Sequence, residues 1–348
     1  MIKGKKEVLS RLMGVTGFHR VMKTAHSGHL TIFNYHRIKD DSPNFKTDFD
    51  DEVFGPSVSQ LEEQLKWLKR NTTVISEDEL LESLRKKTRL PKHATMVTFD
   101  DGYVDNFTHA LPVLSALRIP AIFYIPAQVM NDRSLGWWDH ISYLLKKTHK
   151  SEILLRGIRL RLSDCRERAG QPLFEVMKLQ SFQETSSLVE ELSQVCEVPI
   201  ASHDICSSQL MTWDHLRSAI KQGITIGSHS NTHRVLATLP LATQLEELRS
   251  SKYTLENTLS ISVKTLAYPI GGYEHFSIET MDMAKQLGYE AAFTFTNEIN
   301  DLDAIHPFWI RRISPPENLL LFQGAISWPQ VFIKRRTDLK EPQLSRQV

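Results

Sequence analysis

The sequence ATMVTFDDGY, residues 94–103, joins a short apolar run to two adjacent carboxylates. Its apolar and β-branched start predicts a buried strand. On a continuing strand, the side chains of Asp100 and Asp101 would point to opposite faces of the sheet. Gly102 can adopt backbone angles that other residues avoid, so it can end the strand and turn both carboxylates toward one site. One carboxylate could then bind a cation while the other moves protons. The alternative is a solvated Asp-Asp-Gly turn, which is the common meaning of that tripeptide.

Outward from this stretch, strands and helices alternate along most of the chain. The other expected strands are 30–34, 121–125, 224–227, 264–267, 291–295 and 308–313. The expected helices are one around 61–68 with Ser59-x-x-Glu62 as its capping box, one opened by Ser76-x-x-Glu79, and those at 106–117, 212–221, 241–259 and 277–287. Strands separated by helices predict a parallel α/β architecture, and 348 residues fit one α/β barrel with an insertion.

The alternation breaks down between about residues 131 and 210, which predicts a mostly helical insertion. We therefore expect a lead-in at 1–27, a barrel at 28–330 that carries the insertion, and a polar tail at 331–348.

Composition excludes several classes of function. The formal net charge is +1, from 42 basic and 41 acidic residues, so no global field favours nucleic acid. The N-terminal stretch is interrupted by charges, and no run approaches a membrane span, which predicts a cytoplasmic protein with export or membrane association left open. Cys165, Cys196 and Cys206 are odd in number and lack Cys-x-x-Cys spacing, so we expect inert thiols rather than a disulfide framework. Oligomeric state is not determined by these features.

The chemistry-bearing residues follow the predicted strands. His36, Asp100-Asp101, His229 and Tyr268-Pro269 each come after an apolar run. In a barrel of alternating strands and helices, the carboxyl ends of the strands share the face where sites are built.

His229 and His233 are four residues apart, so on a helical turn both imidazoles could reach one ion. A surface pair is the alternative. Adding one aspartate gives an Asp-His-His set with a position left for water, as a catalytic zinc site needs.

The sequence Thr98-Phe-Asp-Asp-Gly-Tyr103 followed by His229-Ser-x-x-His233 resembles the polysaccharide deacetylases, the NodB-homology or carbohydrate esterase 4 family. The resemblance covers about residues 28–315. It implies a distorted (β/α) barrel, a divalent metal that is usually zinc, and hydrolysis of N-acetyl groups on amino-sugar polymers. It further implies Asp100 as the catalytic base, Asp101, His229 and His233 as the metal ligands, and the backbone N–H of Ile270 as a donor to the oxyanion.

Two departures narrow the resemblance to one branch. Ala267 stands where many members carry an arginine that orients the base, and no Leu-x-His near the C-terminus supplies the usual acid. Tyr35-His36-Arg37, Ala-Tyr-Pro-x-Gly at 267–271 and the segment 308–313 resemble the exopolysaccharide deacetylases that act on poly-N-acetylglucosamine-like chains. In that branch an early histidine takes the acid role, which implies His36; His306 is a weaker candidate.

Arg312 is expected to replace the missing arginine. On a strand at 308–313, residues 308, 310 and 312 share a face, and Phe308 and Ile310 make that face the buried one. An unpaired buried charge is costly, so we expect Arg312 to pair with Asp100; the alternative is an arginine that reaches solvent.

Three functions remain open at this point. The leading one is a metal-dependent hydrolase acting on an N-acetylated glycan, with Trp137 and Trp138 either stacking on sugar rings or simply packing. The others are a carbohydrate-binding relative without activity and a hydrolase of a small amide or cyclic imide.

Overall fold

The computed structural model describes residues 28–162, 170–177 and 182–327. The expected lead-in, the expected tail and Cys165 lie outside these residues. Within them, the main parallel strands of the central sheet stand side by side in the order in which they occur in the chain. They are β1 (His29–Tyr35), β5 (Ala94–Asp100), β6 (Ala121–Ile125), β9 (Ile224–Ser228), β10 (Thr265–Ala267) and β11 (Ala291–Phe293). The short strand β4 (Thr73–Val74) also pairs with β5, and β12 (Asn300–Asp301) runs antiparallel to β1. A parallel sheet wound in chain order is the arrangement of a barrel.

Residues 308–313 join the two edges of this sheet. Parallel bridges link Ile310 to Phe293 of β11 and Ile313 to Phe33 of β1. The barrel is therefore closed, but by a distorted segment, as the predicted fold class requires.

The prediction of a regular strand at 308–313 was wrong. Between its two bridges the backbone turns to other partners, since Arg311 N–H donates to the Asn300 side chain and Arg312 C=O accepts from Asn297 N–H. The expected two-residue alternation is nevertheless present, because Phe308, Ile310 and Arg312 are all buried.

The inside of the barrel changes from apolar to polar along the strands. Leu30 and Ile32 of β1 and Met96 of β5 belong to the interior apolar cluster. Two residues further along each strand, the same face carries Asn34 and Thr98, and Asp100 comes last. The alternation of side chains thus delivers a buried carboxylate to the carboxyl end of the barrel.

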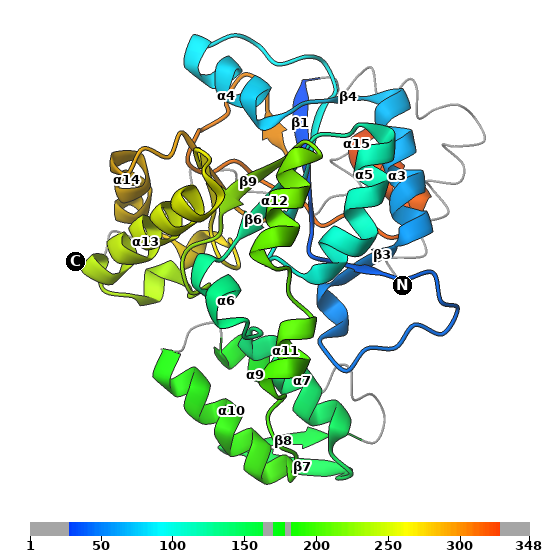
Figure 1. Ribbon diagram of the computed structural model, residues 1–348, viewed down its shortest axis with the longest axis vertical. Coiled ribbons are helices and arrows are strands. Elements are labelled where there is room, and N and C mark those ends of the chain that lie inside the picture. The colour runs from blue at the N-terminus through cyan, green and yellow to red at the C-terminus, as the bar shows by residue number, and fades with distance from the viewer. Residues whose placement is uncertain (1–27, 163–169, 178–181, 328–348) are drawn as a thin grey trace.

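Helices cover the outside of the sheet (Figure 1). They are α3 (Val58–Asn71), α4 (Glu77–Lys86), α5 (Leu111–Leu117) after a π-helical turn η2 (Asn106–Ala110), α6 (Ala127–Asp132), α12 (Trp213–Lys221), α13 (Leu241–Leu259), α14 (Ile278–Gln286) and α15 (Leu319–Ser327). Short elements are η1 (Asp51–Val53), β2 (Arg37–Lys39), β3 (Phe54–Ser57), η3 (Leu236–Thr238) and η4 (Tyr273–His275). Each described helix is too short or too polar to cross a lipid bilayer.

Of the two expected capping boxes, one is confirmed and one was misplaced. Ser76 and Glu79 cap α4 as predicted. Helix α3 begins earlier than expected and is capped by Ser57 with Gln60, which places Ser59 inside the first turn of the helix.

The insertion forms a lobe beside the barrel (lower part of Figure 1). It contains α7 (Trp137–Lys147), β7 (Glu152–Leu155), β8 (Ile158–Arg161), α9 (Gln171–Met177), α10 (Phe182–Cys196) and α11 (His203–Ser208). It is mostly helical, as expected, and has an apolar core of its own. The β7–β8 hairpin was not predicted; Arg156 and Gly157 form its turn, both with positive φ. Cys196 and Cys206 are buried free thiols.

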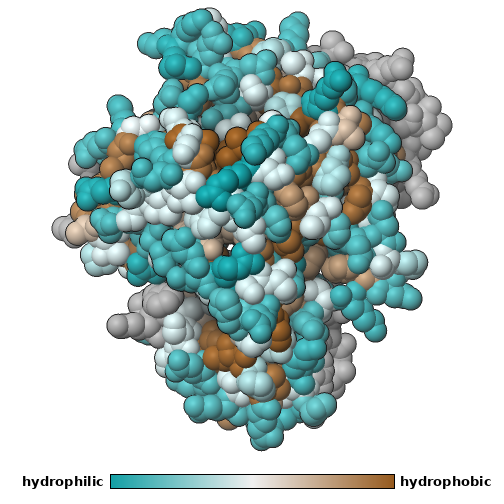
Figure 2. Space-filling model, in the orientation of Figure 1, coloured by the Kyte–Doolittle hydropathy of each residue, from teal (hydrophilic) through white to brown (hydrophobic). Residues whose placement is uncertain are grey.

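The surface is largely hydrophilic, and apolar groups show both on this lobe and in patches on the barrel (Figure 2). Four of its large apolar side chains are exposed: Leu154, Val176, Ile200 and Ile205.

Candidate active site

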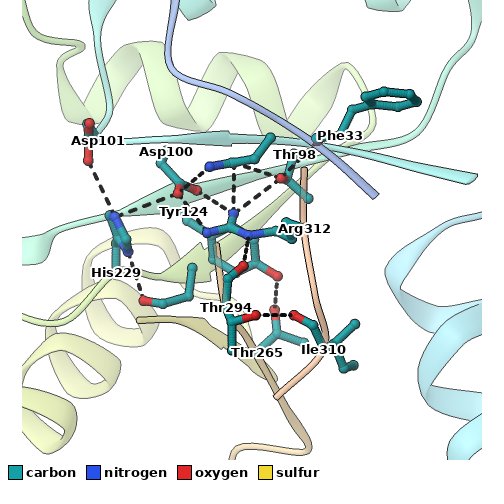
Figure 3. Close-up of polar contacts among 12 residues, drawn as sticks. Phe33, Thr98, Asp100, Asp101, Tyr124, His229, Thr265, Thr294, Ile310 and Arg312 are labelled. Atoms are coloured by element: carbon teal, nitrogen blue, oxygen red, sulfur yellow. Dashed lines mark hydrogen bonds and ion pairs between the residues drawn. The ribbon is translucent and has the colours of Figure 1, made fainter. Parts of the chain in front are cut away.

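Arg312 and Asp100 form a buried, two-pronged ion pair at the carboxyl end of the barrel (Figure 3). Arg312 Nη1 donates to Asp100 Oδ1 at 2.7 Å, and Nη2 donates to Oδ2 at 2.8 Å. Arg312 Nε donates to the carbonyl oxygen of Thr294, which fixes the plane of the guanidinium. The predicted contact between Arg312 and Asp100 is therefore present.

Asn34 is the second side chain, besides Arg312, that holds the carboxylate of Asp100. Its Nδ2 donates to Asp100 Oδ2 at 2.9 Å, while its Oδ1 accepts from Arg312 Nη1 at 2.8 Å and from the Thr98 hydroxyl at 2.9 Å. No role was predicted for Asn34, although an amide at the end of an apolar strand was an available signal. With these contacts, both carboxylate oxygens are held in one orientation.

The groups around Asp100 also set the pKa of its carboxyl. Burial is the largest single effect and would raise the pKa of this carboxyl, but the charges of Arg312 and His229 and the hydrogen bonds from Arg312 together outweigh it. The pKa is lowered as a result, so Asp100 is ionised at neutral pH and able to accept a proton.

Asp101 leaves the strand in an unusual conformation. Its φ is +75°, as is that of Gly102. The expectation that Gly102 alone makes the turn was thus incomplete. The left-handed conformation of Asp101 breaks the alternation of side chains, so both carboxylates serve one site.

His229 and His233 follow β9 on a loop, so the expected helical turn was wrong. Ser230 and His233 have φ values of 59° and 58°, and these two left-handed residues bring the imidazoles together. Glu247 of α13 holds the loop, since one of its carboxylate oxygens accepts the N–H groups of Asn231 and Thr232 at 3.0 and 2.8 Å. Nothing local in the sequence marks Glu247 as a partner of this loop.

Asp101, His229 and His233 have the geometry of a metal site. One ligand atom from each lies within 4.8 Å of the others. Asp101 Oδ1 is 3.4 Å from His229 Nε2 and 3.1 Å from His233 Nε2, yet this buried oxygen accepts no hydrogen bond within the described chain. His229 Nδ1 lies 2.8 Å from the carbonyl oxygen of Ala267, which leaves Nε2 as the ligand atom. A buried carboxylate oxygen without a hydrogen bond, facing two imidazoles, fits a divalent cation that accepts nitrogen and oxygen ligands.

His36 lies at the same end of the barrel, directly after β1. Its ring is 5.4 Å from that of Phe295, and its backbone oxygen accepts from Asn106 at 2.6 Å. Burial lowers the pKa of His36, and the nearby charges of Asp101 and Asp100 only partly offset this effect. The histidine is thus within electrostatic reach of the carboxylates; its role as the acid stays a prediction.

Ile270 occupies a strained turn. Its φ is +61°, rare for a β-branched residue, and Gly271 N–H donates back to Pro269 O at 2.6 Å. A Cβ at Gly271 would lie 2.5 Å from the backbone nitrogen of Phe295, so only glycine fits there. The N–H of Ile270 has no partner within the described residues, which leaves it free to bind a substrate oxygen.

Two further residues, His306 and Tyr273, have structural partners. His306 stacks on Trp309 with ring centroids 3.7 Å apart, and its Nδ1 accepts from Phe308 N–H. Tyr273 bonds to Glu298 and Arg311.

Tyr103 links the segment 98–103, which carries Asp100 and Asp101, to the insertion. Its hydroxyl donates to Asp139 at 2.7 Å and accepts from Trp138 Nε1 at 2.9 Å. The Trp138 ring lies 4.8 Å from the ring of His233. The sequence Gly136-Trp-Trp-Asp139 therefore places an aromatic wall beside His233, one of the three candidate metal ligands.

This geometry can be compared with known proteins. The sequence matches the polysaccharide deacetylase family over residues 87–158 and 164–292, more than half of the chain. The protein belongs to this family, which confirms the family predicted from the sequence.

Curated relatives point to the predicted branch. Poly-β-1,6-N-acetyl-D-glucosamine N-deacetylase of Escherichia coli K12 is 31% identical over 99 residues, which are 28% of this chain and 14% of that protein. The protein of the same name from Staphylococcus aureus MSSA476 is 28% identical over 127 residues, 34% of this chain and 43% of that protein. The chain thus matches less than half the length of either relative.

Solved structures share the fold. A deacetylase of Streptococcus pyogenes, solved with acetate, has a TM-score of 0.55 at 17% identity and covers 83% of this chain and 93% of its own. IcaB of Ammonifex degensii has a TM-score of 0.54 at 16% identity and covers 86% of this chain and 97% of its own.

Proposed function

We propose that the protein is a metal-dependent hydrolase that removes N-acetyl groups from an amino-sugar polysaccharide or its precursor. One observation carries the proposal: a buried carboxylate, Asp100, is held ionised by Arg312 directly beside the Asp101, His229 and His233 cluster. Family membership supports the reaction class. The names of the relatives make poly-β-1,6-N-acetyl-D-glucosamine the first polymer to test.

Asp101, His229 and His233 would hold the ion, and their mixed oxygen and nitrogen donors suit zinc. When bound, such an ion supplies Lewis-acid polarisation of the amide carbonyl and a pKa near 7 for water.

The chain's own groups would then divide the proton transfers. Asp100 accepts a proton from the attacking water, and Arg312 and Asn34 keep its carboxylate aimed and ionised. The free N–H of Ile270 donates to the oxygen that gains charge in the tetrahedral intermediate. His36 donates a proton to the nitrogen as the C–N bond breaks, and its lowered pKa makes it a ready donor once protonated.

The test combines metal analysis with acetate release from β-1,6-linked N-acetylglucosamine oligomers. We expect close to one divalent ion per chain, and acetate release that chelation abolishes and zinc restores. Oligomer binding without acetate release from the metal-loaded protein would favour the inactive carbohydrate-binding relative. Hydrolysis of small amides or cyclic imides, with none of the glycan, would favour the third function.

A further inference from the structure

A cavity of about 320 Å³ lies between the barrel and the insertion and reaches the metal cluster. Asp101 and His233 form part of its wall on the barrel side. Apolar side chains form much of the rest, among them Val129, Leu135, Trp137, Trp138, Val235 and Leu239. Asp100, His36 and Ile270 do not line it. The cavity therefore opens beside Asp101 and His233, on a side where Asp100, His36 and Ile270 are absent from the wall.

The wall nearest the metal ligands is rigidly built. Trp138 folds over Gly136, where a Cβ would lie 2.3 Å from the indole ring. The indole N–H is bound by Tyr103, which is itself anchored on the buried carboxylate of Asp139. Because glycine makes room for the ring and the anchored Tyr103 hydroxyl holds its N–H, the cavity is formed before any ligand arrives.

The chemistry of the intermediate indicates what enters this cavity. A tetrahedral carbon formed from an amide carries four substituents: the attacking oxygen, the former carbonyl oxygen, the nitrogen with its sugar, and the acyl carbon. In the proposed function the attacking oxygen faces Asp100, the former carbonyl oxygen faces the N–H of Ile270, and the nitrogen faces His36. The acyl carbon is the substituent left without a partner among these groups, and the cavity opens beside Asp101 and His233 on a side that none of them lines.

Resting on the proposed function, we propose that this cavity binds the acyl group and that the protein hydrolyses N-acyl amino sugars whose acyl chains are longer than acetyl. A methyl group needs about the space of one water molecule, roughly 30 Å³, so acetyl would leave most of the cavity empty. A butyryl or hexanoyl chain would fill it and cover its apolar wall. In the reaction the C–N bond breaks and a C–O bond forms from water. The chain leaves as a carboxylate, and the nitrogen takes up a proton as the amine.

The experiment uses the full, zinc-loaded protein and β-1,6-linked glucosamine oligomers carrying N-acetyl, N-butyryl or N-hexanoyl groups. Release of amine is measured, because this readout is the same for every acyl group. We expect kcat/KM for the butyryl and hexanoyl oligomers to equal or exceed that for acetyl, with KM falling about fourfold per added methylene, the equivalent of about 0.8 kcal/mol. If acetyl is removed and hexanoyl is at least tenfold slower in kcat/KM, this inference fails while the deacetylase function stands. If the metal-loaded protein releases amine from none of them, both fail.

Product binding provides a readout without turnover. Hexanoate should bind at least tenfold more tightly than acetate in titration calorimetry, because its longer chain buries more apolar surface. Equal affinities would overturn the inference.

A variant that narrows the cavity tests its location. Val129→Phe adds volume inside the cavity without removing a polar contact, and we expect the hexanoyl-to-acetyl ratio of kcat/KM to fall at least tenfold. Trp309→Ala is the matched control, since this indole stacks on His306 away from the cavity, and it should keep the wild-type ratio. Metal content shows that each variant is folded. An unchanged ratio in a metal-loaded Val129→Phe protein would rule out this cavity as the acyl site.

Discussion

Replacing Arg312 with methionine tests the central ion pair. The guanidinium is fully buried and donates to both oxygens of Asp100, to Thr294 and to Asn34. Methionine fills similar space but leaves the Asp100 charge buried without a partner. Removing one member of a buried ion pair costs about 3–5 kcal/mol for this reason. We expect Arg312→Met to lower the free energy of unfolding by that amount at pH 7.

The sign of the pH dependence follows from the pKa of Asp100. In the wild type the pKa of Asp100 is lower in the folded state than in the unfolded state. The ionised Asp100 therefore stabilises the fold at any pH above its unfolded-state pKa, and this contribution is lost as pH falls through the folded-state pKa. Without Arg312, burial is the dominant effect on Asp100 and raises its pKa above the ordinary value of an aspartate. The difference between variant and wild type should therefore be large at pH 7 and shrink below about pH 4, near the unfolded pKa of aspartate.

Urea unfolding of the metal-free protein at pH 7 and just below about pH 4 measures the difference in the free energy of unfolding between variant and wild type. Arg217→Met is the control, because Arg217 pairs with Asp214 on the surface, and it should change stability by less than about 0.5 kcal/mol. The double variant Asp100→Asn/Arg312→Met removes both charges and should cost at least about 2 kcal/mol less than the sum of the single changes. Additive effects, or a loss under about 1 kcal/mol in Arg312→Met, would refute the reasoning.

Three further predictions concern the metal, the acid and stability. His229→Ala should lose both metal and acetate release, whereas Asp100→Asn should keep its metal and lose activity; normal metal loading of His229→Ala would remove that histidine from the site. His36→Ala should keep its metal but lose at least about 10²-fold in kcat, a loss typical of a missing general acid, with the high-pH fall of the rate profile altered or absent; a fully active variant would assign the proton to another donor. Burial raises the pKa of Glu77 from 4.5 to about 7, so the folded state binds more protons than the unfolded state between these values and stability falls as pH rises through that window. Glu77→Gln keeps an oxygen to accept the Thr265 hydroxyl and should be more stable than the wild type by up to about 3 kcal/mol at pH 8 but not at pH 4; equal urea midpoints at pH 8 would contradict this.

Local pattern alone determined much of this protein. An apolar run followed by Asp100 and Asp101, a second followed by His229, and helices between them were enough to predict a parallel α/β architecture, and the family resemblance of these motifs implied the distorted barrel with its site at the carboxyl ends of the strands. Side-chain alternation on 308–313 also predicted that Arg312 is buried, even though that segment is not a regular strand. These features depend on the periodic spacing of apolar residues, which can be read from residues close together in the sequence.

Other features of the site were decided only by the tertiary structure. Asn34 meets Asp100 across 66 residues of sequence because β1 pairs with β5, and Arg312 meets it across 212 residues because residues 308–313 close the sheet. Trp138 likewise reaches His233 only because Tyr103 and Gly136 seat the insertion against the barrel. Periodicity tells which face of an element is buried, but not which distant element packs against that face. That choice is made by the closure of the sheet and the packing of the whole chain.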